Sequence, residues 1–388
     1  MQSVKGLRLA WLGHASGRRA DGLSTYSEQV VQGLLERGAE VRFHHAAGDG
    51  GVVPGRPLEV VSWPSIKVKT VTVPQPGFKP QMAAWLNSRR PAVTHCSLSM
   101  TLADGWVAEQ ALRAGSATVV TFHLPFGLVG SSRAAVMQEL HRFWARRLGS
   151  YQRVIVFSQD HLERLTRVGF TRERLRVVPN AVDLDLFSPG IGTLRRSRLP
   201  EAGLVVGYLG RLDPEKGIRQ LLVGFRRAEL GPDARLLVAG DGVLRPMVQR
   251  AAAGDPRVLH LGRLQGIRAR VDFWRSIDLF CLPSSAEGLS LSLLEAMATG
   301  RAVAVTAAGG LEAAGPGGLE LDPRRLADSV AARLSEAAQH PELVREKGAL
   351  ARAEAVRHHG IETMVGRLLD IYSELGAVAP EHEGRKAT

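Results

Sequence analysis

Short apolar runs alternate with longer stretches of helical periodicity along nearly the whole sequence. The runs 7–13, 204–209 and 277–283 are almost continuously apolar, which is typical of strands covered on both faces of a parallel sheet. Stretches with helical periodicity follow at 25–37 and 217–227. Strands and helices that alternate in this way form doubly wound parallel sheets. The sequence therefore predicts an α/β fold.

Two cycles of this pattern predict two Rossmann-like domains that face a central cleft. With 388 residues, the chain is long enough for two domains that each bury a core. The first domain is expected over 1–188 and the second over 204–360, with a linker at 189–203 where periodicity is weak. The last helix, 361–378, is expected to pack back towards the first domain, and 379–388 form a polar tail.

Several features bear on the compartment. No apolar run approaches the ~20 residues needed to cross a bilayer, and the first expected strand begins too early to leave room for a signal peptide. The two cysteines, Cys96 and Cys281, lie in apolar runs, as small buried side chains in a reducing compartment do. The sequence therefore predicts a cytoplasmic protein.

The net charge of +12 is concentrated in the first half of the chain. Residues 1–200 contain 26 Lys and Arg against 14 Asp and Glu, whereas residues 201–388 contain 24 of each. A basic half suggests an anionic acceptor or peripheral contact with the inner face of the cell membrane. The alternative, which is favoured, is that the arginines are spread over solvated helices.

A basic chain also suggests a membrane surface or nucleic acid as a partner, and one sequence feature bears on each. An expected helix at 131–148 has an apolar stripe beside arginines, which core packing explains better than contact with an anionic membrane surface. Nucleic acid is not expected as a partner, because no segment combines clustered basic and aromatic residues.

Two glutamates, Glu287 and Glu295, lie at the start of one expected helix in the second domain. Glu287 is in the loop after an apolar strand, and Glu295 is about one turn into the helix. Between them, Gly288, Leu289 and Ser290 can aim backbone N–H groups at an anion, because a helix N-terminus carries partial positive charge. A ligand with many hydroxyls and a phosphate at one end fits this arrangement, which points to a nucleotide-sugar.

Two cations follow the first strand of the second domain. Gly210 ends that strand, and Arg211 and Lys216 lie in the turn after it. A guanidinium and an ammonium group together can neutralise a diphosphate without a metal ion. The alternative is a pair of surface cations at a turn. Because Glu287 and Glu295 follow another strand of the same expected sheet, the diphosphate interpretation is favoured.

With these motifs the chain resembles the family 4 retaining glycosyltransferases of the GT-B fold. The resemblance extends over essentially the whole chain, and it rests on residues 210–211 with 216–217, 239–242, 261–263, 287–295, and 177–183 with Phe187. It implies transfer of a hexose, with retention of the α configuration, from UDP-glucose, GDP-mannose or a similar nucleoside diphosphate sugar. The acceptor would be a hydroxyl of a glycolipid, a polysaccharide or a small metabolite, and neither a metal ion nor a cofactor is expected.

The resemblance also implies roles for individual residues. Gly210 would border the donor, and Arg211 and Lys216 would bind its diphosphate and stabilise the charge that develops as it leaves. Glu287 would bind hydroxyls of the donor sugar, and the backbone of residues 288–290 would contact sugar or phosphate. On this basis Arg211, Lys216 and Glu287 are assigned to catalysis.

Other positions of the implied donor site are less closely tied to the reacting bond. Glu295 would hold the ribose hydroxyls, and Arg263 and Leu264 would lie beside the base. Gly22 matches the glycine-rich turn that the family places against the phosphates, although Asp21 stands where a first glycine is usual. The loop at 308–318 is shortened relative to the family pattern, which alters the rim of the implied donor pocket.

His123 ends an apolar strand of the first domain and is also assigned to catalysis. A lone histidine at such a place more often satisfies a backbone carbonyl, but the segment resembles one that touches the donor sugar near the reacting carbon. Two other functions remain open at this point. One is a sugar-nucleotide epimerase or phosphorylase on the same fold, and the other is a non-catalytic nucleotide-sugar-binding protein.

Overall fold

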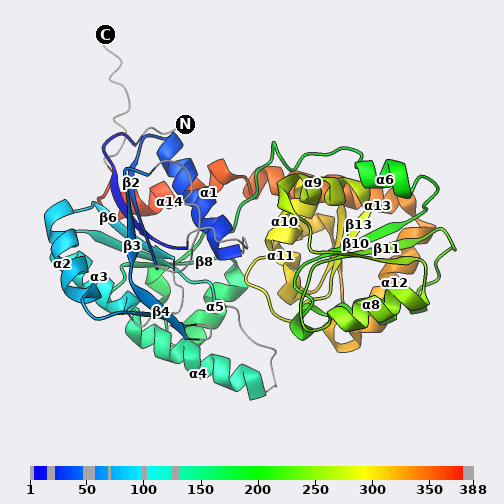
Figure 1. Ribbon diagram of the computed structural model, residues 1–388, viewed down its shortest axis with the longest axis horizontal. Coiled ribbons are helices and arrows are strands. Elements are labelled where there is room, and N and C mark those ends of the chain that lie inside the picture. The colour runs from blue at the N-terminus through cyan, green and yellow to red at the C-terminus, as the bar shows by residue number, and fades with distance from the viewer. Residues whose placement is uncertain are drawn as a thin grey trace, which may run out of the picture. The chain divides into compact units, whose positions relative to one another are not determined.

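The structure, a computed structural model, describes residues 4–14, 22–46, 57–68, 71–97, 103–124 and 132–378. The chain forms two compact units, each an α/β fold (Figure 1). Of the described residues, unit 1 contains those up to 124 together with 132–181 and 361–378, and unit 2 contains 182–360.

Unit 1 is built on a parallel sheet with the strand order β3-β2-β1-β6-β7-β8-β9. Its strands are β1 (Arg8–Leu12), β2 (Glu40–Ala46), β3 (Glu59–Trp63), β6 (Val93–Ser97), β7 (Ala117–Thr121), β8 (Arg153–Val156) and β9 (Leu175–Val177). Every residue of β6 and β7 is buried, as expected for strands covered on both faces.

The remaining elements of unit 1 are six α-helices, a 3₁₀ turn and a small hairpin within the described residues. They are α1 (Gly22–Glu36), α2 (Phe78–Arg89), α3 (Asp104–Arg113), α4 (Ser132–Arg147), α5 (Gln159–Arg167), η1 (Arg172–Arg174), α14 (Ile361–Glu374), and the antiparallel strands β4 (Ser65–Val68) and β5 (Val71–Pro74). The hairpin was not predicted, because its strands are too short to show a clear period.

Unit 2 repeats the design with a parallel sheet in the order β12-β11-β10-β13-β14-β15. Its strands are β10 (Val205–Leu209), β11 (Arg235–Ala239), β12 (Val258–Gly262), β13 (Leu279–Leu282), β14 (Ala302–Val305) and β15 (Gly318–Glu320). Two doubly wound parallel sheets confirm the predicted fold class.

Eight α-helices and four 3₁₀ turns complete unit 2. The helices are α6 (Thr193–Arg198), α7 (Ile218–Arg227), α8 (Arg245–Gly254), α9 (Gly266–Ser276), α10 (Leu291–Ala298), α11 (Leu311–Ala314), α12 (Leu326–Gln339) and α13 (Pro341–His358). The 3₁₀ turns are η2 (Pro214–Lys216), η3 (Ala307–Gly309), η4 (Gly315–Gly317) and η5 (Pro323–Arg325). Among the helices of the described residues, none has both the length and the apolar character needed to span a membrane.

Residues 189–203, predicted as a linker, cluster with unit 2. Helix α6 lies within them and packs against α9. The backbone N–H and hydroxyl of Thr193 both donate to Asp272 Oδ1, and Arg195 Nη1 lies 3.1 Å from Asp278 Oδ2. Polar contacts of this kind leave no apolar period in the sequence, which is why the helix was not predicted.

Helix α14 belongs to unit 1, although it follows unit 2 in the sequence. It packs against α1, where Arg37 Nη2 lies 2.6 Å from Glu362 Oε2. The chain enters unit 2 at Val182 and leaves it at Gly360, and these two residues form an isolated parallel β-bridge. Unit 2 is therefore an insertion whose two ends lie side by side.

A buried hydrogen-bond network joins α14 to the centre of the unit 1 sheet. His95 Nδ1 lies 2.6 Å from the Tyr372 hydroxyl, and His95 Nε2 lies 2.8 Å from Thr121 Oγ1. The Tyr26 hydroxyl lies 3.0 Å from the same Thr121 oxygen. Burial lowers the pKa of His95 to about 3, and it does the same for His44 and His161.

Each sheet has one place where the chain order reverses. In unit 1, β1 pairs with β2 on one side and β6 on the other, and in unit 2, β10 pairs with β11 and β13. Loops that leave the carboxyl ends of two such central strands diverge, and ligands of open α/β sheets bind in the crevice between them. The fold therefore marks the loops after β1 and β6, and those after β10 and β13, as candidate sites.

Because of the buried histidines, we expect the free energy of unfolding to fall in acid. Because their folded-state pKa lies below the ordinary value near 6.5, the unfolded chain binds more protons as the pH drops, so each buried histidine costs about 2 kcal/mol of unfolding free energy at pH 5. We expect His95→Gln to shrink the loss between pH 7.5 and pH 5 by about that amount. Urea unfolding at both pH values measures it, and His340→Gln, at an exposed histidine, is the control. An unchanged loss in His95→Gln would contradict this account.

Candidate functional site

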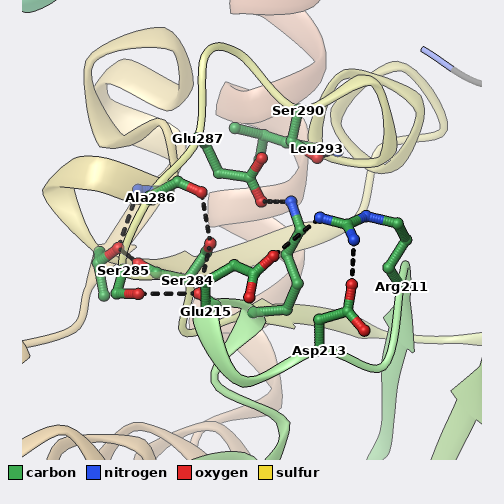
Figure 2. Close-up of polar contacts among 12 residues, drawn as sticks. Arg211, Asp213, Glu215, Ser284, Ser285, Ala286, Glu287, Ser290 and Leu293 are labelled. Atoms are coloured by element: carbon green, nitrogen blue, oxygen red, sulfur yellow. Dashed lines mark hydrogen bonds and ion pairs between the residues drawn. The ribbon is translucent and has the colours of Figure 1, made fainter. Parts of the chain in front are cut away.

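The loops that follow β10 and β13 are held in close contact at the switch point of unit 2. Gly217 adopts φ +70°, and a Cβ atom on it would lie 1.9 Å from the carbonyl oxygen of Pro283. Only glycine fits this approach. The Glu215 carbonyl accepts from the backbone N–H of Ser285 at 2.8 Å, and also from the hydroxyls of Ser284 and Ser285 at 3.1 and 3.0 Å (Figure 2).

This contact brings together two of the predicted catalytic residues. Lys216 Nζ lies 2.6 Å from Glu287 Oε1, and the two side chains are only 16% and 10% exposed. Lys216 ends η2 after β10, and Glu287 lies in the loop between β13 and α10. The expected proximity of the two loops is therefore seen directly in an ion pair.

Arg211, the second predicted cation, extends from the loop after β10 towards Asp213 and Glu215 (Figure 2). Its guanidinium pairs with the Asp213 carboxylate and, at 2.8 Å, with Glu215 Oε1. Unlike Lys216, its side chain is 66% exposed, so its ion pairs are screened by water and can exchange for those of a ligand. Gly210, at the end of β10, lies half-buried directly before Arg211.

Glu295 is buried in α10, with 4% exposure, and its carboxylate is held from α9. Arg270 donates to Oε1, and Trp274 Nε1 donates to Oε2 at 2.8 Å. The Arg270 guanidinium also lies over the Phe187 ring, 5.6 Å from its centroid. Arg270 and Trp274 were not predicted as site residues, although their spacing of four residues places them on one helix face. Ribose binding by Glu295 stays a prediction.

The other predicted donor-site residues lie on neighbouring loops of unit 2. Ser290 is the N-cap of α10, where its hydroxyl accepts from the Leu293 N–H at 3.4 Å, and Leu289 before it is buried. Gly288 is half-buried. Arg263 is exposed and Leu264 half-buried in the loop between β12 and α9. Their contacts with a donor stay predictions.

In unit 1, His123 follows β7 and is enclosed by polar and aromatic side chains. Its Nε2 atom lies 2.8 Å from the hydroxyl of Ser97, which ends β6. The rings of Tyr26 and Phe157 lie 5.0 and 5.2 Å from it. Burial, reinforced by nearby histidines, lowers the pKa of His123 well below its ordinary value, so the ring is neutral at pH 7.

Two further expectations concern unit 1. Gly22 is the first residue of α1 and is exposed, whereas Asp21 lies outside the described residues. On α4, Trp144 is buried, whereas Phe143 is exposed beneath the Arg147 guanidinium. Packing thus accounts for part of the apolar stripe, and membrane contact stays a prediction. Within the described part of the chain, no group of three or more potential metal ligands occurs.

Comparison with known families matches most of the chain. Residues 20–186 match the family described as Glycosyltransferase Family 4, and residues 203–340 match Glycosyl transferases group 1. The two matches are separated by residues 187–202, close to the start of unit 2, and together they include every predicted site residue.

Two curated relatives come from Mycolicibacterium smegmatis. A D-inositol 3-phosphate glycosyltransferase is 29% identical over 87% of this chain and 82% of its own length. A GDP-mannose-dependent alpha-mannosyltransferase is 29% identical over 62% of this chain and 63% of its own length. The chain thus spans less than two thirds of the second relative.

Solved structures agree with the fold. Crystal structures of HepE from Anabaena, in complexes with UDP and with UDP-glucose, superpose with TM-scores of 0.74 and 0.72. They cover 95% and 94% of this chain and 100% and 99% of HepE, at 18% sequence identity.

The buried Glu295 predicts a large effect on stability. Because Glu295→Ala leaves the Arg270 guanidinium without its carboxylate in a mostly buried position, we expect it to lower the unfolding free energy by about 3 kcal/mol. Trp274→Phe removes one hydrogen bond and should cost about 1 kcal/mol. Urea denaturation measures both, and Glu320→Ala, at an exposed glutamate of β15, is the control. Glu295→Ala as stable as the control would show that the pair contributes nothing.

Proposed function

Because the chain belongs to the family 4 glycosyltransferases, we propose that it transfers a hexosyl group from a nucleoside diphosphate sugar to an acceptor hydroxyl, with retention of the α configuration. The observation that carries this proposal is the convergence of Arg211, Lys216 and Glu287 at the switch point of unit 2. Two cations in the loop after β10 suit a diphosphate, and a carboxylate from the adjoining loop after β13 suits sugar hydroxyls.

In the proposed reaction the bond between the anomeric carbon and the diphosphate oxygen breaks, and the electron pair stays on the diphosphate. Arg211 and Lys216 stabilise the negative charge that develops there, which lowers the barrier without covalent chemistry by the protein. The acceptor oxygen attacks from the same face, and its proton passes to the departing phosphate oxygen. This course keeps the α configuration.

Glu287 acts in this proposal as a binding group rather than as a nucleophile. Its Oε1 atom is paired with Lys216 at 2.6 Å, so the carboxylate is oriented by the same cation that meets the diphosphate. The pair of flanking carboxylates that glycosidases use is a different arrangement. Glu287 therefore positions the sugar relative to the leaving group.

Binding of the donor requires the ion pairs of Arg211 to change. Its guanidinium is shared by Asp213 and Glu215, and these bonds lie at an exposed position where exchange costs little. The diphosphate, which carries more charge than either carboxylate, would replace them. Lys216, which is mostly buried, would keep its contact with Glu287 and turn a second N–H bond to the phosphate.

Two donors are supported by the relatives. The fold of HepE, crystallised with UDP-glucose, favours UDP-glucose, and the mannosyltransferase favours GDP-mannose. An acceptor of the kind used by the D-inositol 3-phosphate glycosyltransferase, a small phosphorylated polyol, is one candidate. Lipid and polysaccharide hydroxyls are the others.

The proposal predicts the effect of removing either cation. We expect Lys216→Ala and Arg211→Ala to lower kcat by about 10²- to 10³-fold with the preferred donor, as loss of one preorganised electrostatic donor does. Release of nucleoside diphosphate from UDP-glucose and GDP-mannose, with a panel of acceptors, measures kcat. Arg245→Ala removes an exposed arginine of α8 that pairs with Asp241 and should leave kcat unchanged.

Either alanine variant with near-normal kcat would rule out its role at the diphosphate. The anomeric configuration of the product, read from the proton coupling of the transferred sugar, tests retention separately. A product of β configuration would overturn the same-face course, while leaving transferase activity in place.

A further inference from the structure

A cavity opens in unit 1 at its switch point. Leu12, Gly13 and His14, at the end of β1, line one side, and Ser97, at the end of β6, lies beside them. The β4–β5 hairpin and the starts of α2 and α3 complete the lining. The lining residues used below are His44, Trp63, Ser65, Thr72, Phe78 and Asp104. The cavity is thus built within one unit, where open α/β sheets bind ligands.

The wall of this cavity is aromatic and rigid. The Trp63 and Phe78 rings meet edge to face, 5.1 Å apart. Trp63 Nε1 donates to His44 Nδ1 at 3.1 Å, and the two rings are nearly parallel. A buried ring that accepts a hydrogen bond and has a pKa of about 3 is neutral, so this part of the wall carries no charge at neutral pH.

Apart from His14, His44 and His45, the polar side chains that line the cavity are hydroxyls and one carboxyl group. Hydroxyls come from Ser65, Thr72 and Ser97, and Asp104 supplies a carboxyl group. No lysine or arginine is found among the described lining residues. A phosphate dianion placed there would lose its hydration without gaining a cation, and it would meet Asp104, both of which are unfavourable.

Ser97 connects the cavity with His123. Its hydroxyl lines the cavity and also lies 2.8 Å from His123 Nε2. A molecule in the cavity would therefore lie one side chain away from the residue that the family resemblance places near the reacting carbon. A donor diphosphate would need cations such as Arg211 and Lys216, which lie in the loop after β10, whereas the described lining of this cavity contains no lysine or arginine.

We propose that this cavity holds the acceptor, and that it selects an uncharged sugar or polyol ring over one that carries a phosphate. The inference rests on the proposed transferase function and specifies its acceptor class. The aromatic pair Trp63 and Phe78 would pack against the apolar face of the ring, and the hydroxyls of Ser65, Thr72 and Ser97 would bind its hydroxyls.

The test compares matched acceptors at pH 8, where histidine side chains are ordinarily neutral. The full-length protein is given UDP-glucose or GDP-mannose with methyl glucoside, p-nitrophenyl glucoside or myo-inositol, and with glucose 6-phosphate or inositol 3-phosphate. Nucleoside diphosphate release gives kcat/KM. We expect at least a tenfold preference for the uncharged ring over its phosphorylated counterpart, and equal or reversed preference would overturn the proposal.

A cation placed in the wall provides a second measurement. Thr72→Lys should lower kcat/KM for the uncharged acceptor and raise it for the phosphorylated one, so that the preference changes by at least tenfold. Gln81→Lys adds the same charge at an exposed position of α2 and should leave the preference as it is. The same change in both variants would show a general charge effect and would count against the cavity as the acceptor site.

Failure of this inference is distinguishable from failure of the proposed function. A donor that shifts the melting temperature and is slowly hydrolysed, but is transferred only to phosphorylated rings, would overturn the acceptor class and leave the transferase function standing. If no donor is bound or hydrolysed, the proposed function fails, and the acceptor assignment that rests on it fails as well.

Discussion

The close approach of Gly217 to the Pro283 carbonyl determines where the charged groups of unit 2 can meet. A side chain at Gly217 would force the loops after β10 and β13 apart, since its Cβ would lie 1.9 Å from the carbonyl oxygen. Because the loops touch, Lys216 and Glu287 are within 2.6 Å of each other. Everything proposed about the donor, from diphosphate binding to sugar orientation, depends on this backbone contact rather than on the charges alone.

The two units use the same topological position for different chemistry. In unit 2 the switch point collects two cations and three carboxylates, Asp213, Glu215 and Glu287, as a site for a highly charged ligand requires. In unit 1 the corresponding place is lined by aromatic rings and hydroxyls. Such a division is what the proposed reaction would require, because charge would develop on the leaving group while the acceptor would arrive as a neutral hydroxyl.

Much of the fold could be predicted from the sequence, because buried parallel strands and amphipathic helices leave strong periods. The hairpin β4–β5 and helix α6 could not, since the strands are short and α6 is held by polar contacts to Asp272 and Asp278. Motif spacing predicted Arg211, Lys216, Glu287 and Glu295 as donor-site residues, and their roles stay predictions, but it did not predict the side chains with which they pair. Pairing depends on which loops touch, and that is a property of the assembled sheet.

The β-bridge between Val182 and Gly360 holds the residues where the chain enters and leaves unit 2 side by side. The Val182 N–H also donates to the His359 carbonyl at 2.8 Å, so the two passages of the chain are fastened to each other. A segment with adjacent ends can be exchanged for another without moving the chain that receives it. The described residues of unit 2 form one continuous stretch of sequence, so unit 2 can be replaced as a whole. Under the proposed function, such a replacement would change the donor while leaving the chain of unit 1 as it is.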